Sequence, residues 1–204
     1  MLCKLLIGIA GGTGAGKTTL VKILQQQFSE QVVCLSHDSY YRDLSSLSLD
    51  ERRQVNFDHP DSLETELMIK QLKELIKGQS IKVPIYDFNV SNRTDKTSLV
   101  KPKSVVIVEG ILIFADPILS DLFQIKVFVD APADVRLGRR IKRDIEERGR
   151  TLEHSLNQYL TMSRPMHEQY VEPSKKFADV IVPEGGKNTI ATQMLINLIE
   201  KYLK

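Results

Sequence analysis

The sequence predicts an α/β fold in which helices cover both faces of a five-stranded parallel sheet. Five apolar runs are continuous, which is typical of strands buried on both faces: Leu5–Ala10, Val32–Leu35, Val105–Val108, Ile125–Val129 and Val180–Val182. Helical patterns lie between these runs, and strands that alternate with helices form a parallel sheet in three layers. The 204 residues fit one α/β domain, so we expect a single domain over residues 1–204.

Two helices are predicted in the first half of the chain. One follows residues 11–18, and its apolar residues recur at every fourth position: Leu20, Leu24 and Phe28. The other runs from about Ser62 to Lys77, with Asp61 as its predicted N-cap and Glu64 as the capping-box residue. Much of its apolar stripe comes from Leu63, Leu67, Leu75 and Ile76.

Two more helices are predicted in the second half. The third starts near Ala133, and its apolar residues are Val135, Ile141 and Ile145. The fourth follows Asn188, and its apolar stripe consists of Ile190, Met194, Leu198 and Tyr202.

Residues 81–101 depart from this alternation of strands and helices. The run Ile81–Tyr86 alternates between apolar and polar residues and contains Pro84, which lacks the N–H group that a central strand needs. A polar stretch follows as far as Lys96, and Thr97–Lys101 is placed to pair back. We therefore expect a β-hairpin at the periphery of the fold.

Composition limits the partners, the metal sites and the cellular location that we expect for the protein. The net charge of +2 gives no reason to expect nucleic acid or a membrane as a partner. Cys3 and Cys34 fall in predicted buried strands without C-x-x-C spacing, so we expect reduced thiols in a cytoplasmic protein. The four histidines are scattered, which disfavours a zinc site. The apolar N-terminal run contains Lys4 and leads straight into residues 11–18, which indicates a core strand rather than a signal peptide or membrane span.

Residues 11–18, Gly-Gly-Thr-Gly-Ala-Gly-Lys-Thr, fit the phosphate-binding loop pattern G-x-x-x-x-G-K-[ST]. They stand between a predicted strand and a predicted helix, as the motif requires, and the alternative is a chance glycine-rich turn. Lys17 is predicted to reach the β- and γ-phosphates and the Thr18 hydroxyl to ligate Mg²⁺. The residues expected to bind the nucleotide are Gly11, Gly12, Thr13, Gly14, Ala15, Gly16, Lys17, Thr18 and Thr19. The sequence therefore predicts a P-loop NTPase fold that binds a nucleoside triphosphate.

Two acidic residues follow predicted strands, at the sheet edge where open α/β folds bind ligands. Glu109 follows Val105–Val108 and is predicted to hold Mg²⁺ directly or through water, the alternative being a surface acid that ends a strand. Asp38 follows Val32–Leu35 and is placed to accept the proton of an alcohol, unless it only caps a turn or helix.

Residues 136–150 are rich in basic side chains, namely Arg136, Arg139, Arg140, Lys142, Arg143, Arg148 and Arg150. With Gly149 near the end of this run, we predict a mobile lid over about residues 136–152 that brings guanidinium groups to the phosphates and excludes water. A solvated helix face is one alternative. A nucleic-acid patch is another, but no series of stacking aromatic residues adjoins the run.

Two clusters, Asn56–Asp61 and Tyr86–Phe88, combine acidic and aromatic residues. They suit a nucleoside, because a carboxylate accepts hydrogen bonds from ribose hydroxyls and a ring stacks on the base. Helix capping by Asp58 or Asp61 and ordinary packing of Tyr86 explain the same residues. The residues alone leave this choice open.

In this order and spacing, the motifs resemble uridine–cytidine kinases, within the phosphoribulokinase/uridine kinase group of P-loop kinases. Besides the phosphate loop, the resemblance rests on Asp38–Tyr41, Asn56–Asp61, Pro84–Phe88, Val108–Leu112, Arg139–Arg150 and Ala178–Val182. It covers nearly the whole chain and implies Mg²⁺-dependent transfer of the γ-phosphate of ATP or GTP to the 5′-hydroxyl of uridine or cytidine. It also implies a homo-oligomer, commonly a tetramer.

The resemblance assigns roles by matching position. It implies that Asp38 is the general base and that Thr18, Asp38 and Glu109 hold the metal. The implied catalytic residues are Asp38, Lys17, Arg143 and Arg148. The residues implied to bind the nucleoside are Tyr41, Phe57, Asp58, Tyr86, Phe88, Ser91, Arg140, Arg150 and Gln158.

One position departs from the resemblance. The family usually has a histidine a few residues after Tyr-Asp-Phe, where it contacts the pyrimidine edge, and this chain has Ser91, with Asn89 and Asn92 nearby. Serine is too short for the same contact, so a kinase of another small alcohol or of an unusual nucleoside stays open. A GTPase-like switch is a third hypothesis, but no aspartate is followed by glycine three residues later, as the D-x-x-G motif requires.

Overall fold

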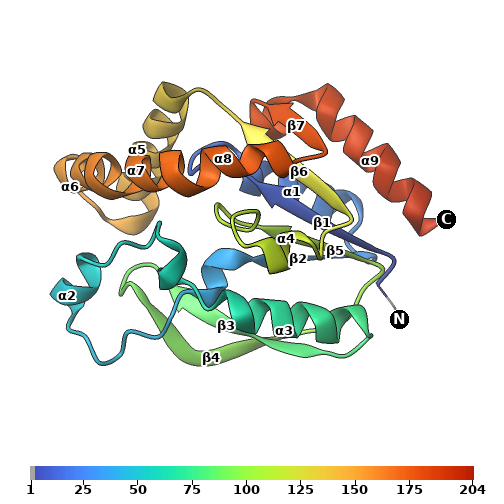
Figure 1. The fold of residues 1–204 in the computed structure, drawn as a ribbon, viewed down its shortest axis with the longest axis horizontal. Coiled ribbons are helices and arrows are strands. Elements are labelled where there is room, and N and C mark those ends of the chain that lie inside the picture. The colour runs from blue at the N-terminus through green and yellow to red at the C-terminus, as the bar shows by residue number, and fades with distance from the viewer. Residues whose placement is uncertain (1–2) are drawn as a thin grey trace.

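The computed structural model describes residues 3–204 and confirms the predicted α/β fold (Figure 1). Five parallel strands form the central sheet in the order β2–β5–β1–β6–β7. Their bounds are β1 (Leu5–Ala10), β2 (Val32–Ser36), β5 (Val105–Glu109), β6 (Ile125–Asp130) and β7 (Val180–Pro183). Each of the five predicted apolar runs is thus a strand of this sheet.

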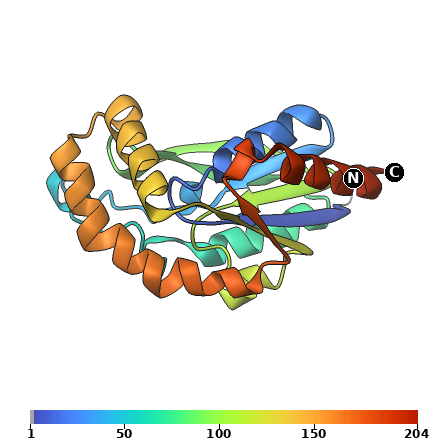
Figure 2. The same ribbon diagram turned by 90° about the horizontal axis from the view of Figure 1, so that it is seen from above.

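Helices cover both faces of the sheet, as predicted (Figure 2). Helices α1 (Lys17–Gln27) and α9 (Thr189–Leu203) pack on one face, whereas α3 (Thr65–Ile76) and α4 (Pro117–Ser120) pack on the other. Along β1, successive side chains belong to different clusters, because side chains of a strand alternate between its two faces. Burial on both faces explains the continuous apolar runs of β1 and β5. The run Val180–Val182 was predicted to be buried in the same way, but it forms the edge strand β7, in which Val180 and Ile181 are exposed.

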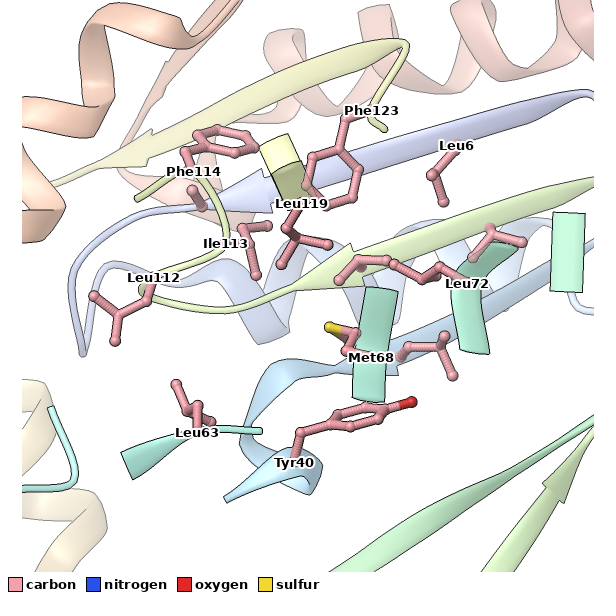
Figure 3. Packing of buried hydrophobic residues seen from close by; sticks show 14 of the residues in the cluster. Leu6, Tyr40, Leu63, Met68, Leu72, Leu112, Ile113, Phe114, Leu119 and Phe123 are labelled. Atoms are coloured by element: carbon pink, nitrogen blue, oxygen red, sulfur yellow. The ribbon is translucent and has the colours of Figure 1, made fainter. Parts of the chain in front are cut away.

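The cluster between the sheet and α3 holds these layers together (Figure 3). Met68 and Leu72 of α3 are completely buried there. The rings of Phe114 and Phe123 meet edge to face with centroids 5.8 Å apart, beside Leu119 of α4. Burial of each such side chain contributes about 1.5–3 kcal/mol, so this packing fixes α3 and α4 against the strands.

Strands β3 (Ile81–Asp87) and β4 (Asn92–Val100) form the predicted hairpin outside the central sheet. The return strand is longer than the predicted 97–101 segment. Pairing shifts register between Pro84 and Tyr86 and then continues to the turn, so the polar residues before 97 also belong to β4.

Helix α3 begins later than predicted. It starts at Thr65, because residues Pro60–Ser62 form a separate 3₁₀ turn. The predicted capping by Asp61 and Glu64 is wrong. The Glu64 carboxylate instead accepts a 2.7 Å hydrogen bond from the guanidinium of Arg93, which ties the hairpin to the start of α3.

The apolar stripe predicted for α9 is not its buried face. Ile190 and Met194 are exposed, and the residues that pack on the sheet are Leu195, Ile196 and Ile199. Helix α9 has two overlapping apolar faces. The predicted stripe follows one of them, and the sheet packs mainly against the other.

Helix α5 (Ala133–Arg148) buries a charged face instead of an apolar one. Its buried residues are Arg136, Arg140 and Asp144, which are spaced by four and therefore lie on one side. Val135 and Ile145, which belong to the predicted apolar pattern, are exposed. Arg140 lines a cleft, whereas Arg136 donates to the carbonyl oxygen of Ala131 and Asp144 pairs with neighbouring arginines.

Helix α2 (Leu49–Arg53) was not predicted. It begins with a capping box in which Ser48 and Glu51 bond to each other's backbone N–H groups. The S-x-x-E signal for this helix is present in the sequence.

The helical stretch over residues 152–177 was also not predicted. It contains α6 (Leu152–Gln158), α7 (Arg164–Met166) and α8 (Glu172–Ser174), and π-helical turns separate them. Pro165 and Pro173 lie within this stretch, and each removes a backbone N–H donor, which favours such irregular turns.

Over residues 3–204, no helix has the length and apolar character needed to cross a membrane. Cys34 lies in β2, but Cys3 precedes β1, contrary to its predicted place in a strand. Both cysteines are free thiols, and burial raises the pKa of Cys34 to about 12.

Candidate active site

The carboxyl ends of the central strands open into a cleft of ≈ 380 Å³. Most of the predicted site residues line it, namely Thr13, Gly14, Gly16, Lys17, Thr18, Thr19, Asp38, Tyr41, Phe57, Asp58, Tyr86, Phe88, Glu109, Arg140, Arg143, Arg148, Arg150 and Gln158. Gly11, Gly12 and Ala15 are buried within the phosphate loop and do not line the cleft. The tertiary structure thus brings together side chains from distant parts of the chain.

The loop between β1 and α1 curls tightly because its glycines adopt left-handed backbone angles. Gly14 and Gly16 have φ values of 76° and 103°. A Cβ atom on Gly14 would lie 2.3 Å from the carbonyl oxygen of Arg136, so the backbone could not approach so closely with another residue. The N-terminus of α1 follows, and its free N–H groups and helix dipole favour an anion at this place.

Lys17 is held inside this loop. Its ammonium donates hydrogen bonds to the carbonyl oxygens of Gly11 at 2.9 Å and Gly12 at 3.2 Å. Burial lowers the pKa of Lys17, and the neighbouring carboxylates of Glu109 and Asp38 act in the opposite direction. A desolvated ammonium beside the loop is placed to bind phosphate oxygens.

The predicted metal ligands line the same cleft. Glu109 is the last residue of β5, and its carboxylate accepts a 3.1 Å hydrogen bond from the Thr18 hydroxyl. Burial raises the pKa of Glu109, and the nearby Lys17 ammonium opposes this effect. Asp38 stands in the 3₁₀ turn His37–Tyr40, directly after β2, which is the neighbour of β5.

These side chains fit Mg²⁺ in their chemistry. Thr18, Asp38 and Glu109 offer only oxygen atoms, and Mg²⁺ is usually held by one or two carboxylates together with phosphates and water. Among the described residues, no group of three or more His, Cys, Asp or Glu side chains could hold a metal ion. Such a site therefore depends on phosphate oxygens to complete the coordination.

Four aromatic rings, those of Tyr41, Phe57, Tyr86 and Phe88, line the part of the cleft that we call the aromatic end. The centroids of Tyr41 and Tyr86 lie 4.9 Å apart, and those of Tyr86 and Phe88 lie 5.1 Å apart. The guanidinium of Arg148 stacks over the Phe88 ring at 4.2 Å. The rings meet at interplanar angles of 51° to 79°, so the aromatic end offers an apolar wall of angled rings with a cation at its border.

Asp144 of α5 is fully buried and holds four arginines, which we call the arginine cluster. The nitrogen–oxygen distances are 3.3 Å to Arg143, 3.4 Å to Arg148, 3.5 Å to Arg140 and 3.7 Å to Arg150. One carboxylate against four guanidinium groups leaves the cluster positive, which suits an anionic ligand. This role of Asp144 was not predicted, although its spacing of four from Arg140 and Arg148 is a signal in the sequence that could reveal it.

Asp58 belongs to a second network at the aromatic end. Its carboxylate accepts a 2.6 Å hydrogen bond from Ser163 and lies 3.8 Å from Arg140. Arg140 and Arg150 both donate to the side-chain oxygen of Gln158, at 3.0 Å and 2.7 Å. Asp58 is therefore not a helix cap. Ser163 and Gln158 come from the unpredicted helical stretch, and no sequence motif points to Ser163.

Arg139 of the predicted lid also lines the cleft, together with five residues that were not predicted for the site: Lys22, Ser36, Gly110, Ile111 and Glu147. Arg139 reaches the phosphate loop, where its guanidinium donates to the carbonyl oxygens of Gly14 and Ala15 at 3.4 Å. Ser91 differs from the other predicted residues, because it lines an adjoining cavity instead of the cleft.

A family model described as the phosphoribulokinase / uridine kinase family matches residues 6–191. The chain belongs to this family. The matched range includes the central sheet except Leu5, the phosphate loop and the aromatic end of the cleft.

Two relatives match over nearly their full length. The chain is 50% identical over 200 residues to the uridine kinase of Clostridium botulinum strain Kyoto, which covers 98% of this chain and 97% of the relative. It is 49% identical over 198 residues to the uridine kinase of Clostridium perfringens strain SM101, which covers 97% and 95%. In fold, it resembles the solved phosphoribulokinase from Rhodobacter spheroides, with a TM-score of 0.63 at 13% identity over 88% of this chain and 69% of that one.

Proposed function

We propose that this protein is a nucleoside kinase that transfers the γ-phosphate of ATP or GTP to the 5′-hydroxyl of uridine or cytidine, giving UMP or CMP in pyrimidine salvage. The observation that carries the proposal is the single cleft that joins a phosphate loop, Asp38 and an aromatic end. Relatives named uridine kinase, at 49–50% identity over nearly the full chain, support the choice of acceptor.

In this proposal Asp38 accepts the proton of the 5′-hydroxyl as its oxygen attacks the γ-phosphorus. The new O–P bond forms while the bond from the γ-phosphorus to the bridging oxygen of the nucleoside diphosphate breaks. Lys17 and Arg143 balance the charge on the transferred group, and Arg143 lies close to the loop, 3.4 Å from the Thr13 hydroxyl. Mg²⁺, held by Thr18 with Glu109 and Asp38, supplies further positive charge when bound.

The acceptor is positioned by the two networks of the aromatic end. Asp58, oriented by Ser163, accepts hydrogen bonds from the ribose hydroxyls, and Arg140 supports it. The base lies among the aromatic rings, with Arg150 and Gln158 on its polar side. Because both networks draw on the stretch after Gly149, the segment of about 136–152 acts as a lid that orders these groups on binding.

We also propose that the protein forms a homo-oligomer, with the tetramer implied by the resemblance as the expected form. Its support is the exposed apolar surface of Ile181, Ile190 and Met194, since large exposed apolar side chains often mark contacts with another chain. Light scattering would give the number of subunits.

The activity is tested by release of ADP from ATP and Mg²⁺ with a panel of acceptors. The panel contains uridine, cytidine, purine nucleosides, deoxynucleosides and ribulose 5-phosphate. Turnover with uridine or cytidine at the highest kcat/KM is the expected result. Silence on both, with activity on another alcohol, would overturn the proposal.

The role of Asp38 is tested by Asp38→Asn. We expect kcat to fall by about 10²–10⁴-fold, the usual contribution of a general base, with the unfolding midpoint unchanged. Asp61→Asn removes an exposed carboxylate that does not line the cleft and should leave kcat within about twofold, because its side chain is 91% exposed. Near-normal turnover in a folded Asp38→Asn variant would remove Asp38 from this role.

A further inference from the structure

A second cavity of ≈ 260 Å³ adjoins the aromatic end of the cleft. The two spaces share the rings of Phe57 and Phe88 and the polar side chains of Arg148, Arg150 and Gln158. A ligand that lies against these rings therefore faces the second cavity directly. We call this space the side cavity.

The side cavity lies beside the turn of the hairpin. Asn89 and Ser91 line it from that turn, and Ser91 is buried with a left-handed φ of 49°. Serine has one of the shortest polar side chains, so the turn approaches the cavity without filling it. The other side of the wall comes from Thr151 and His154, at the start of α6.

The wall of the side cavity carries positive charge. Among the described residues, the side chains that line it include Arg53, Arg148 and Arg150 but no carboxylate. Arg148 and Arg150 are neutralised in part by Asp144. Asp50 neutralises the charge of Arg53 only weakly, because the 3.5 Å ion pair between them is exposed to solvent. The cavity therefore suits an anionic or hydrogen-bond-accepting group.

The proposed acceptor pose brings one edge of the base to this place. The 5′-hydroxyl lies at Asp38 and the ribose at Asp58, so the base extends away from both into the aromatic end. A pyrimidine is joined to ribose through N1, which makes C4 the opposite ring atom and places C5 next to it. A substituent on C4 or C5 therefore projects beyond the rings toward the side cavity.

We propose that the side cavity is an extension of the acceptor site that receives an anionic or hydrogen-bond-accepting substituent on C4 or C5 of a pyrimidine nucleoside. Arg53 and His154 select this substituent, and the short side chain of Ser91 makes room for it. This inference rests on the proposed function, because it assumes that the base occupies the aromatic end.

The experiment compares kcat/KM for uridine, cytidine, 5-methyluridine, 5-carboxymethyluridine and N4-carboxymethylcytidine. The wild-type enzyme is expected to use at least one of the two carboxymethyl nucleosides as well as it uses the unsubstituted nucleoside. In Arg53→Gln, the kcat/KM of that nucleoside should fall by about tenfold relative to uridine, as expected for a lost hydrogen bond between charged groups. His154→Gln should lower the same ratio by a smaller factor.

Ser91→His tests the room in the cavity. An imidazole would occupy part of it, so the kcat/KM ratio of carboxymethyl nucleoside to uridine should fall by about tenfold or more. Arg164→Gln is the matched control, because Arg164 is exposed, pairs with Glu168 and lines neither cavity. The ratio should be the same in this variant as in the wild type.

The outcomes separate this inference from the proposed function. Normal turnover of uridine with rejection of both carboxymethyl nucleosides overturns the inference and leaves the function intact. A ratio that is unchanged in Arg53→Gln and Ser91→His overturns it as well. Turnover of a carboxymethyl nucleoside without turnover of uridine or cytidine supports the side cavity and corrects the acceptor, whereas silence on all five overturns both proposals.

Discussion

The two ends of the cleft are built in different ways. The phosphate loop is one continuous segment whose backbone forms the binding surface, and a single lysine and threonine complete it. The aromatic end is assembled from side chains of the β2 tip, the loop around Phe57, the hairpin, α5 and α6. In the proposed function, the first end recognises phosphate, which every nucleoside triphosphate carries, whereas the second distinguishes one acceptor from another.

This difference indicates which part of the cleft can tolerate amino-acid substitutions. A backbone cradle with glycines at left-handed angles tolerates almost no change, because a Cβ atom on Gly14 would meet the backbone of α5. Side chains at the aromatic end can be exchanged one at a time. Ser91 illustrates this, since a different residue at this position would change the wall of the side cavity and would leave the phosphate loop unchanged.

The largest expected effect is a loss of kcat that is the same for both acceptors when the phosphate-binding end is changed. Lys17→Met removes the ammonium that serves the donor, so we expect kcat to fall by about 10²–10³-fold, by a similar factor for uridine and cytidine. Steady-state kinetics with both acceptors would measure this. Lys22→Met is the control, since Lys22 lines the cleft without a bond to the loop carbonyls, and a smaller loss is expected. Unequal losses for the two acceptors would contradict the division of labour between the ends.

The second prediction concerns the arginine cluster of the aromatic end. Asp144→Asn leaves four guanidinium groups without their buried carboxylate, which should destabilise the fold by about 3 kcal/mol and raise the KM for the nucleoside. Denaturant unfolding and steady-state kinetics would measure the two effects. Glu146→Gln on the same helix removes an exposed ion pair with Lys142 and should cost less than about 1 kcal/mol. Equal stability of the two variants would show that Asp144 does not hold the cluster.

The third prediction uses His37, which is buried at the tip of β2 between the two ends. Burial lowers the pKa of His37 from 6.5 to about 4, so the folded protein keeps the ring neutral where the unfolded chain binds a proton. Stability is therefore lost as pH falls from about 6.5 toward 4, by about 2 kcal/mol between pH 7 and pH 5. His37→Gln should remove this part of the pH dependence. Unfolding curves at both pH values would show it, and parallel slopes in wild type and variant would refute it.

The central sheet and the phosphate loop could be predicted because the sequence patterns that indicate them are local. Continuous apolar runs mark strands buried on both faces, and the phosphate loop lies within eight consecutive residues. The buried faces of α5 and α9 could not be predicted from such local patterns. Apolar spacing assumes that a helix turns its apolar side to the core, but α5 buries Arg136, Arg140 and Asp144 instead.

By itself, the sequence determined the layered α/β fold, the phosphate loop and the candidates Asp38 and Glu109, because each depends on residue types within a short window. Only the tertiary structure decided that Ser163 orients Asp58 and that Ser91 borders a separate cavity. These contacts join residues that are up to 105 positions apart. Their formation depends on how the helices pack over the strand ends, and no local pattern in the chain specifies that packing.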